Sequence, residues 1–194
     1  TASSVETHGS AAVPRVDVAS AVRTGEELDV PAVDAYLKRI DPSLAGTPRI
    51  TQYSGGASNW TYRLEYDNRD LILRRPPAGT KAKSSHDMGR EYRVQKALAP
   101  VFPWVPQMVA YCHDESVLGS EFYVMERIVG VIPRARMTPD AISPLTAKRL
   151  CENAIDKLVA LHRVDATQPE LAALGKGKGY TKRQIQGWSD RFDK

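Results

Sequence analysis

Five short segments of the chain are rich in the apolar and aromatic residues that favour β-strands. They are residues 50–54, 60–66, 71–74, 107–112 and 122–128. In the second segment Trp60, Tyr62, Leu64 and Tyr66 recur with period two, so they fall on one side of an extended backbone. Turn-forming residues, a glycine pair at 55–56 and the polar run 67–70, separate the first three segments. We therefore predict an antiparallel sheet of five strands.

Four other segments have apolar residues at helical spacing. The first begins after Asp29, a plausible N-cap, with Pro31 in its first turn. Its predicted apolar face is Ala32, Ala35, Tyr36 and Ile40. The second begins at a cap on Ser84 or Ser85 and runs to about Ala99, with Tyr92, Val94 and Leu98 on its buried side. The third, residues 145–163, is predicted to face a core, and the fourth begins at Tyr180.

This order of elements predicts an α+β fold: a lobe of five antiparallel strands with one inserted helix, followed by helices. We place the lobe at residues 25–130 and the helical part at residues 131–194. Residues 1–24 contain no continuous apolar core and are predicted to form a flexible arm.

Composition limits the cellular compartments and the binding partners that we expect for the chain. Two cysteines without metal-ligand spacing fit a reducing cytoplasm, and no apolar run approaches the length of a membrane span. Residues 71–96 contain seven Lys/Arg and two Asp/Glu, which favours a solvated basic face. A nucleic-acid-binding domain is disfavoured, because the basic stretch carries no recognised motif and no aromatic platform. We expect neither a nucleic-acid nor a membrane partner, and the oligomeric state stays open.

Three features in order suggest a site for a phosphorylated ligand. Gly55 and Gly56 form either a simple hairpin turn or a loop whose N–H groups, with the Ser58 hydroxyl, approach phosphate oxygens. Arg74 ends the third strand on the same face as Ile72, where a guanidinium could bind phosphate; the alternative is an exposed strand end. Glu91, seventeen residues after Arg74, could fix its rotamer or belong to a surface salt bridge.

Together these features resemble the N-terminal part of the aminoglycoside phosphotransferase family, which has the protein-kinase-like fold. The resemblance covers about residues 28–194 and is similar to the branch of kinase domains found with acyl-CoA dehydrogenases. It rests, in chain order, on residues 52–59, 71–77, 90–92, 123–126 and 161–162.

The resemblance implies a role for each matching position. The phosphate loop would comprise Gly55, Gly56, Ser58 and Asn59. Arg74 would replace the usual strand-three lysine, contact the α- and β-phosphates and pair with Glu91, while Ile72 faces the base. Met125 would be the gatekeeper beside the adenine pocket, with the Glu126 C=O and the Ile128 N–H at the base edge.

The resemblance also implies ATP and Mg²⁺ as cofactors and a small molecule with a hydroxyl group as acceptor. The catalytic base and the magnesium ligands are expected beyond Lys194, so we predict no metal site and no transfer activity for this chain alone. His162-Arg163-Val164-Asp165 superficially matches a kinase H-R-D motif, but Glu170 stands where an Asn is required, so His162 is predicted to close a helix. The alternative function is a pseudokinase-like module that binds a nucleotide or a partner without chemistry.

Overall fold

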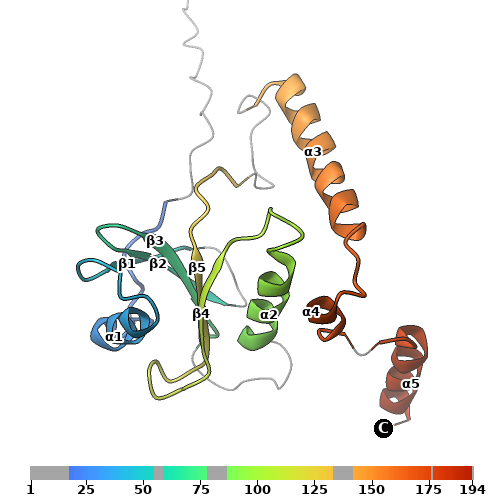
Figure 1. Ribbon diagram of the computed structural model, residues 1–194, viewed down its shortest axis with the longest axis horizontal. Helices are drawn as coiled ribbons and strands as arrows, with labels where there is room; N and C mark the ends of the chain where they lie inside the picture. Colours follow the sequence, from blue (N-terminus) through green and yellow to red (C-terminus); the bar gives the residue numbers. More distant parts are fainter. Residues whose placement is uncertain (1–17, 55–58, 78–86, 133–141, 176, 194) are drawn as a thin grey trace, which may run out of the picture.

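The computed structural model describes residues 18–54, 59–77, 87–132, 142–175 and 177–193. Within these ranges the chain forms a five-stranded sheet and five helices (Figure 1). The α+β fold class predicted from the sequence is confirmed, with one helix inserted between the third and fourth strands.

The sheet is antiparallel throughout, in the spatial order β1-β2-β3-β5-β4. Its strands are β1 (Arg49–Gln52), β2 (Trp60–Glu65), β3 (Asp70–Arg75), β4 (Met108–Cys112) and β5 (Phe122–Glu126). Because β5 lies between β3 and β4, residues of β3 and β5 that are far apart in the sequence are direct neighbours in the sheet. Each strand agrees with its predicted segment to within one or two residues at either end.

One face of the sheet packs against α1 (Val30–Ile40). The Asp29 carboxylate caps this helix as predicted, accepting a 3.0 Å hydrogen bond from the Ala32 N–H. Its buried residues are Val33 and Leu37, whereas Ile40 from the predicted face is 46% exposed. The predicted face was therefore wrong for Ala35 and Ile40, which are exposed, whereas the predicted Tyr36 packs against the core.

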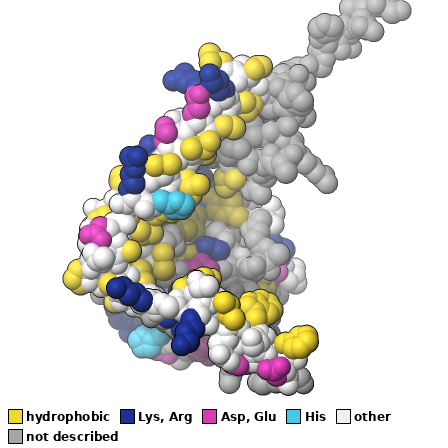
Figure 2. Space-filling model, turned by 90° about the vertical axis from the view of Figure 1, so that its right-hand side faces the viewer, with side chains coloured by type: hydrophobic (Ala, Val, Ile, Leu, Met, Phe, Trp, Pro, Cys, Tyr) yellow, Lys and Arg dark blue, Asp and Glu magenta, His cyan; other side chains and the backbone are white. Residues whose placement is uncertain are grey.

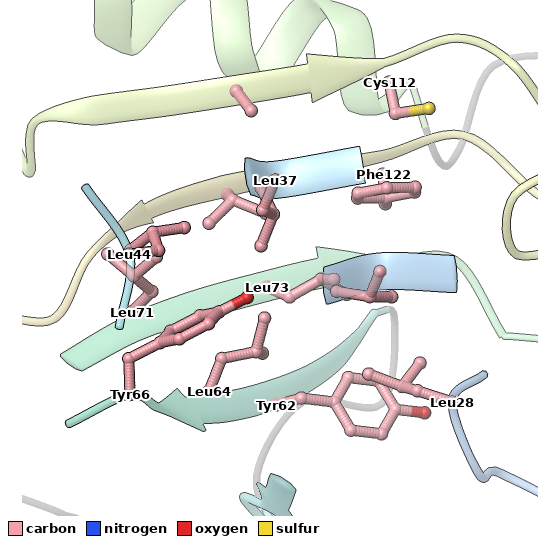
Figure 3. Close-up of a cluster of buried hydrophobic side chains, with 13 residues drawn as sticks. Leu28, Leu37, Leu44, Tyr62, Leu64, Tyr66, Leu71, Leu73, Cys112 and Phe122 are labelled. Carbon is pink, nitrogen blue, oxygen red and sulfur yellow. The ribbon is translucent and has the colours of Figure 1, made fainter. Parts of the chain in front are cut away.

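The hydrophobic core lies between α1 and this face of the sheet (Figure 3). Leu64 and Tyr66 follow the predicted alternation and are buried here, as is Tyr62. Leu71 and Leu73 of β3 join the same cluster, so the intervening residues of β3 must face the other side of the sheet.

The opposite side carries α2 (Met88–Leu98), which contacts β4 and β5 (Figure 1). Its N-cap is Asp87, whose carboxylate accepts a 2.7 Å hydrogen bond from the Arg90 N–H. The predicted caps Ser84 and Ser85 lie outside the described residues. Met88 is fully buried, while Tyr92 is half-buried and stacks on Tyr111 with ring centroids 5.5 Å apart.

Part of the segment predicted as a flexible arm, residues 1–24, contacts the lobe. Ser20 forms a β-bridge with Gln52, and Val22 packs against the core. The C=O groups of Glu26 and Glu27 accept hydrogen bonds from the buried guanidinium of Arg75. Residues 1–17 lie outside the described part of the chain.

Three helices follow the lobe: α3 (Pro144–His162), α4 (Pro169–Ala172) and α5 (Tyr180–Phe192). None of them has a buried residue, and Ile155 of α3 is 61% exposed, so the prediction that α3 faces a core was wrong for this structure. Figure 2 shows apolar side chains along the outer surface of this part. The short α4, which contacts α2, was not predicted. His162 ends α3, as predicted.

Candidate nucleotide-binding site

The side of β3 that faces away from α1 carries the predicted cation of the site. Leu71 and Leu73 point into the core, so Ile72 and Arg74 lie on the opposite face, on the side of α2. Ile72 is 6% exposed, and its cross-strand neighbour on β5 is Met125. Ile72 and Arg74 share one face of the sheet, as the sequence predicts, and the register brings Met125 to the same face.

Arg74 and Glu91 form the predicted ion pair. The Arg74 Nη1 lies 3.0 Å from the Glu91 Oε2, and each side chain is about one-third exposed, at 30% and 34%. The Asp87 cap starts α2 one turn before Glu91, which sets the position of the carboxylate opposite the end of β3. A pair this accessible to water adds little to stability. Its contribution is to place the guanidinium at the end of β3, beside α2.

Tyr123, which the sequence did not single out, completes this pair. It lies directly across from Arg74 in the β3–β5 register and is fully buried. Its hydroxyl accepts a 2.9 Å hydrogen bond from the Arg74 Nη1 and donates a 2.9 Å hydrogen bond to the Glu91 Oε2. Burial is the main cause that raises the pKa of Tyr123, so the phenol stays protonated and able to donate.

The second oxygen of the Glu91 carboxylate is bound by the end of the glycine-rich segment. The Asn59 Nδ2 donates a 2.9 Å hydrogen bond to Glu91 Oε1, and Asn59 is only 4% exposed. This side chain therefore binds the helix carboxylate, which the sequence did not predict. The other predicted loop residues, Gly55, Gly56 and Ser58, lie outside the described residues.

The same face of the sheet carries a charged cluster centred on Asp70. Arg63 donates to both of its oxygens at 2.8 Å, and Arg127 donates to Oδ2 at 2.7 Å. Arg127 also donates from Nε to the Tyr53 hydroxyl at 3.0 Å, which joins the end of β5 to the start of the glycine-rich segment. Burial acts to raise the pKa of Asp70, but the hydrogen bonds from the two arginines outweigh it and the pKa is lowered.

The predicted base-edge residues lie where β5 ends. The Glu126 N–H donates to the Gln107 C=O at 2.9 Å, and its carboxylate pairs with Arg69. Ile128 is 66% exposed, and its N–H donates to no group in the described part of the chain. These positions allow a contact with a flat ligand but do not test it, so the roles of Met125, Glu126 and Ile128 stay predictions.

Neither a metal-binding cluster nor a membrane-spanning helix occurs in the described ranges. No group of three or more His, Cys, Asp or Glu in those ranges is arranged to hold a metal ion. No helix there is long and apolar enough to cross a membrane.

A five-stranded antiparallel sheet whose third strand carries a cation, paired with a carboxylate from the inserted helix, defines the small lobe of a kinase-like phosphotransferase fold. Comparison with known proteins supports this class. The chain belongs to the phosphotransferase enzyme family, whose sequence model matches residues 49–194.

Its relatives include a solved structure and two curated proteins. The structure, from Ralstonia eutropha JMP134, is provisionally described as an aminoglycoside phosphotransferase; it is 30% identical, has a TM-score of 0.69, and the match covers 86% of this chain and 48% of that one. Acyl-CoA dehydrogenase family member 11 of Gallus gallus is 37% identical over 179 residues, which are 90% of this chain and 23% of that protein. The Homo sapiens protein of the same name is 34% identical over 171 residues, covering 86% and 22%. The chain thus spans less than a quarter of these curated relatives.

Proposed function

We propose that this chain is the nucleotide-binding part of a phosphotransferase. It binds ATP, and the enzyme transfers the γ-phosphoryl group of this ATP to a hydroxyl of a small molecule. The observation that carries the proposal is the geometry of Arg74. Both of its bonds, to Glu91 and to Tyr123, use Nη1. Its Nε and Nη2 donate no hydrogen bond within the described ranges, and we propose that they bind phosphate oxygens.

Each part of the site then has a distinct task. Arg74 binds the α- and β-phosphates, and Glu91 keeps its guanidinium in place. Ile72 and Met125 provide an apolar surface for the base, and the backbone of Glu126 and Ile128 bonds its edge. When bound, Mg²⁺ offsets charge on the phosphates. We propose no residue of this chain as the catalytic base or as a magnesium ligand.

The proposal is tested by calorimetric titration of the chain with ATP, ADP, AMP and adenosine. Affinity should fall with each phosphate removed, because the contacts of Arg74 are to phosphate. Arg74→Ala should weaken ATP binding by roughly tenfold or more and leave adenosine unaffected, since a hydrogen bond to a charged group contributes about 1.5–3 kcal/mol. Arg39→Ala is the matched control: it removes the same charge from an exposed position on α1, across the sheet from the site.

Equal affinity of the unchanged chain and the Arg74→Ala variant for ATP would refute the phosphate assignment.

The second candidate function is nucleotide binding without chemistry, and a different measurement distinguishes it from the enzyme. If the coding sequence continues beyond Lys194, an H-G-D-x-x-x-x-N segment with a later Asp and transfer of the γ-phosphoryl group by the longer protein favour the enzyme. ATP binding without any transfer by that protein favours the pseudokinase-like module.

A further inference from the structure

Arg74, Glu91 and Tyr123 form a triangle in which each side chain contacts the other two. The distances are 3.0 Å from Arg74 Nη1 to Glu91 Oε2, 2.9 Å from Arg74 Nη1 to the Tyr123 hydroxyl, and 2.9 Å from that hydroxyl to Glu91 Oε2. The phenol uses its proton toward the acid and a lone pair toward the cation, which is the only assignment that satisfies both charges. A phenylalanine would fill the same buried volume but could bind neither group.

The backbone sets this arrangement. Arg74 and Tyr123 are direct cross-strand partners on β3 and β5, so the phenol has a fixed position relative to the base of the arginine side chain. The guanidinium carbon also lies 5.9 Å from the centroid of the Tyr123 ring. Gln95, one turn after Glu91 on α2, lies with its Nε2 3.4 Å from the same hydroxyl. The hydroxyl is therefore the point where β3, β5 and α2 meet.

This contact changes what the ion pair can do. An arginine held only by a half-exposed carboxylate can rotate about its side-chain bonds, and ordering it on ligand binding costs conformational entropy. The hydrogen bond from the same Nη1 to Tyr123 adds a second restraint on the guanidinium, and neither Nε nor Nη2 donates a hydrogen bond within the described ranges. The glutamate is fixed in turn, because Asn59 binds its other oxygen.

We propose that Tyr123 is a positioning residue of the nucleotide site: its hydroxyl orients Arg74 so that the free edge of the guanidinium meets the phosphates of ATP. The inference rests on the proposed function, since it assigns Tyr123 to the same phosphate contact. It concerns a residue that acts through Arg74 and does not itself touch the ligand.

The experiment compares Tyr123→Phe with Tyr36→Phe in calorimetric titrations of the chain with ATP and with adenosine. Tyr36→Phe is the matched control, because it removes a tyrosine hydroxyl that donates a 2.9 Å hydrogen bond to the Tyr111 C=O from α1, on the other face of the sheet. Tyr123→Phe should weaken ATP binding about three- to tenfold, less than Arg74→Ala, because the lost hydrogen bond acts on ATP only through Arg74. Adenosine binding should not change, and Tyr36→Phe should leave both affinities unchanged.

A second comparison separates positioning from a general effect on folding. In the Arg74→Ala background, Tyr123→Phe should cause less than about a twofold further loss of ATP affinity, since its effect passes through the arginine. Equal weakening of ATP and adenosine, or a full additional loss in that background, would overturn the positioning role. An unchanged ATP affinity in Tyr123→Phe, with Arg74→Ala still weakened, would overturn the inference alone. No ATP binding by the unchanged chain would overturn the proposed function and the inference together.

Discussion

At the scale of single residues, the site depends on how one arginine distributes its N–H groups. One terminal nitrogen of Arg74 contacts both the carboxylate of Glu91 and the hydroxyl of Tyr123. The other two guanidinium nitrogens donate no hydrogen bond in the described ranges. Arginine suits this division, because its planar group carries several donors in fixed directions and keeps its charge at any physiological pH. A lysine has a single nitrogen for all of these contacts.

This difference predicts the behaviour of Arg74→Lys. The ammonium group keeps the charge and can still pair with Glu91, but it has no second edge for a bidentate phosphate contact. We expect ATP affinity to fall about three- to tenfold, less than in Arg74→Ala, as measured by calorimetry. Arg39→Lys on α1 serves as the control. An affinity of Arg74→Lys for ATP above that of the unchanged chain would contradict a contact through two guanidinium nitrogens.

At the scale of secondary-structure elements, the charged cluster around Asp70 connects strands on the side of the sheet that carries Arg74. Arg63 of β2 and Arg127, just after β5, both bind this carboxylate, which lies at the start of β3 between them. Arg127 continues the connection to Tyr53. One acidic side chain therefore holds two arginines that would otherwise repel each other on the same surface.

The cluster predicts a specific acid sensitivity. The pKa of Asp70 is lowered in the fold by the two arginines, despite the opposing effect of burial. A lowered pKa adds stability above the ordinary Asp pKa of about 3.9, and this contribution is lost as the pH falls through the folded-state value. Urea unfolding between pH 7 and pH 3 should therefore show a smaller loss of stability in Asp70→Asn, which is less stable than the unchanged chain at pH 7. Asp156→Asn, on exposed α3, is the control; a pH dependence in Asp70→Asn equal to that of the unchanged chain would contradict the assignment.

The sequence predicted what local rules determine. The strand segments, the Asp29 cap and the end of α3 at His162 follow from side-chain period and capping chemistry, and the structure confirms them. The pairing of Arg74 with Glu91 was predicted from their order along the chain together with the family resemblance, and the ion pair is present.

Other features depend on packing that a linear sequence does not show. The buried face of α1 is decided by which residues fit the sheet, so Val33 and Leu37 replaced the predicted Ala35 and Ile40. Tyr123 was missed because its position opposite Arg74 follows from the β3–β5 register, which joins residues 49 positions apart. Period-two spacing places Tyr123 on the same side of the strand as Met125, but only the register shows that its partner is Arg74.

At the scale of the whole molecule, the described chain divides into a lobe with a core and a helical part without one. The lobe buries the aromatic and aliphatic side chains of β2, β3 and β5 against α1. In α3 and α5, by contrast, Ile155, Trp188 and Phe192 are 61%, 64% and 92% exposed. The main contact back to the lobe is from α4 to α2, with Lys157 of α3 lying 3.8 Å above the Trp104 ring.

This division predicts which parts of the chain unfold locally most often in solution. Local stability follows buried apolar contact, so helices without a buried side chain should open far more often than the central strands. In hydrogen–deuterium exchange followed by mass spectrometry, amides of β3 and β5 should exchange slowest, and those of α3 and α5 should exchange at least about a hundredfold faster. Addition of ATP should slow exchange at β3 and α2, where Arg74 and Glu91 lie, and leave α5 unchanged. Protection of α3 equal to that of β3 would contradict the prediction, because it would require Ile155 and its apolar neighbours to be covered in solution.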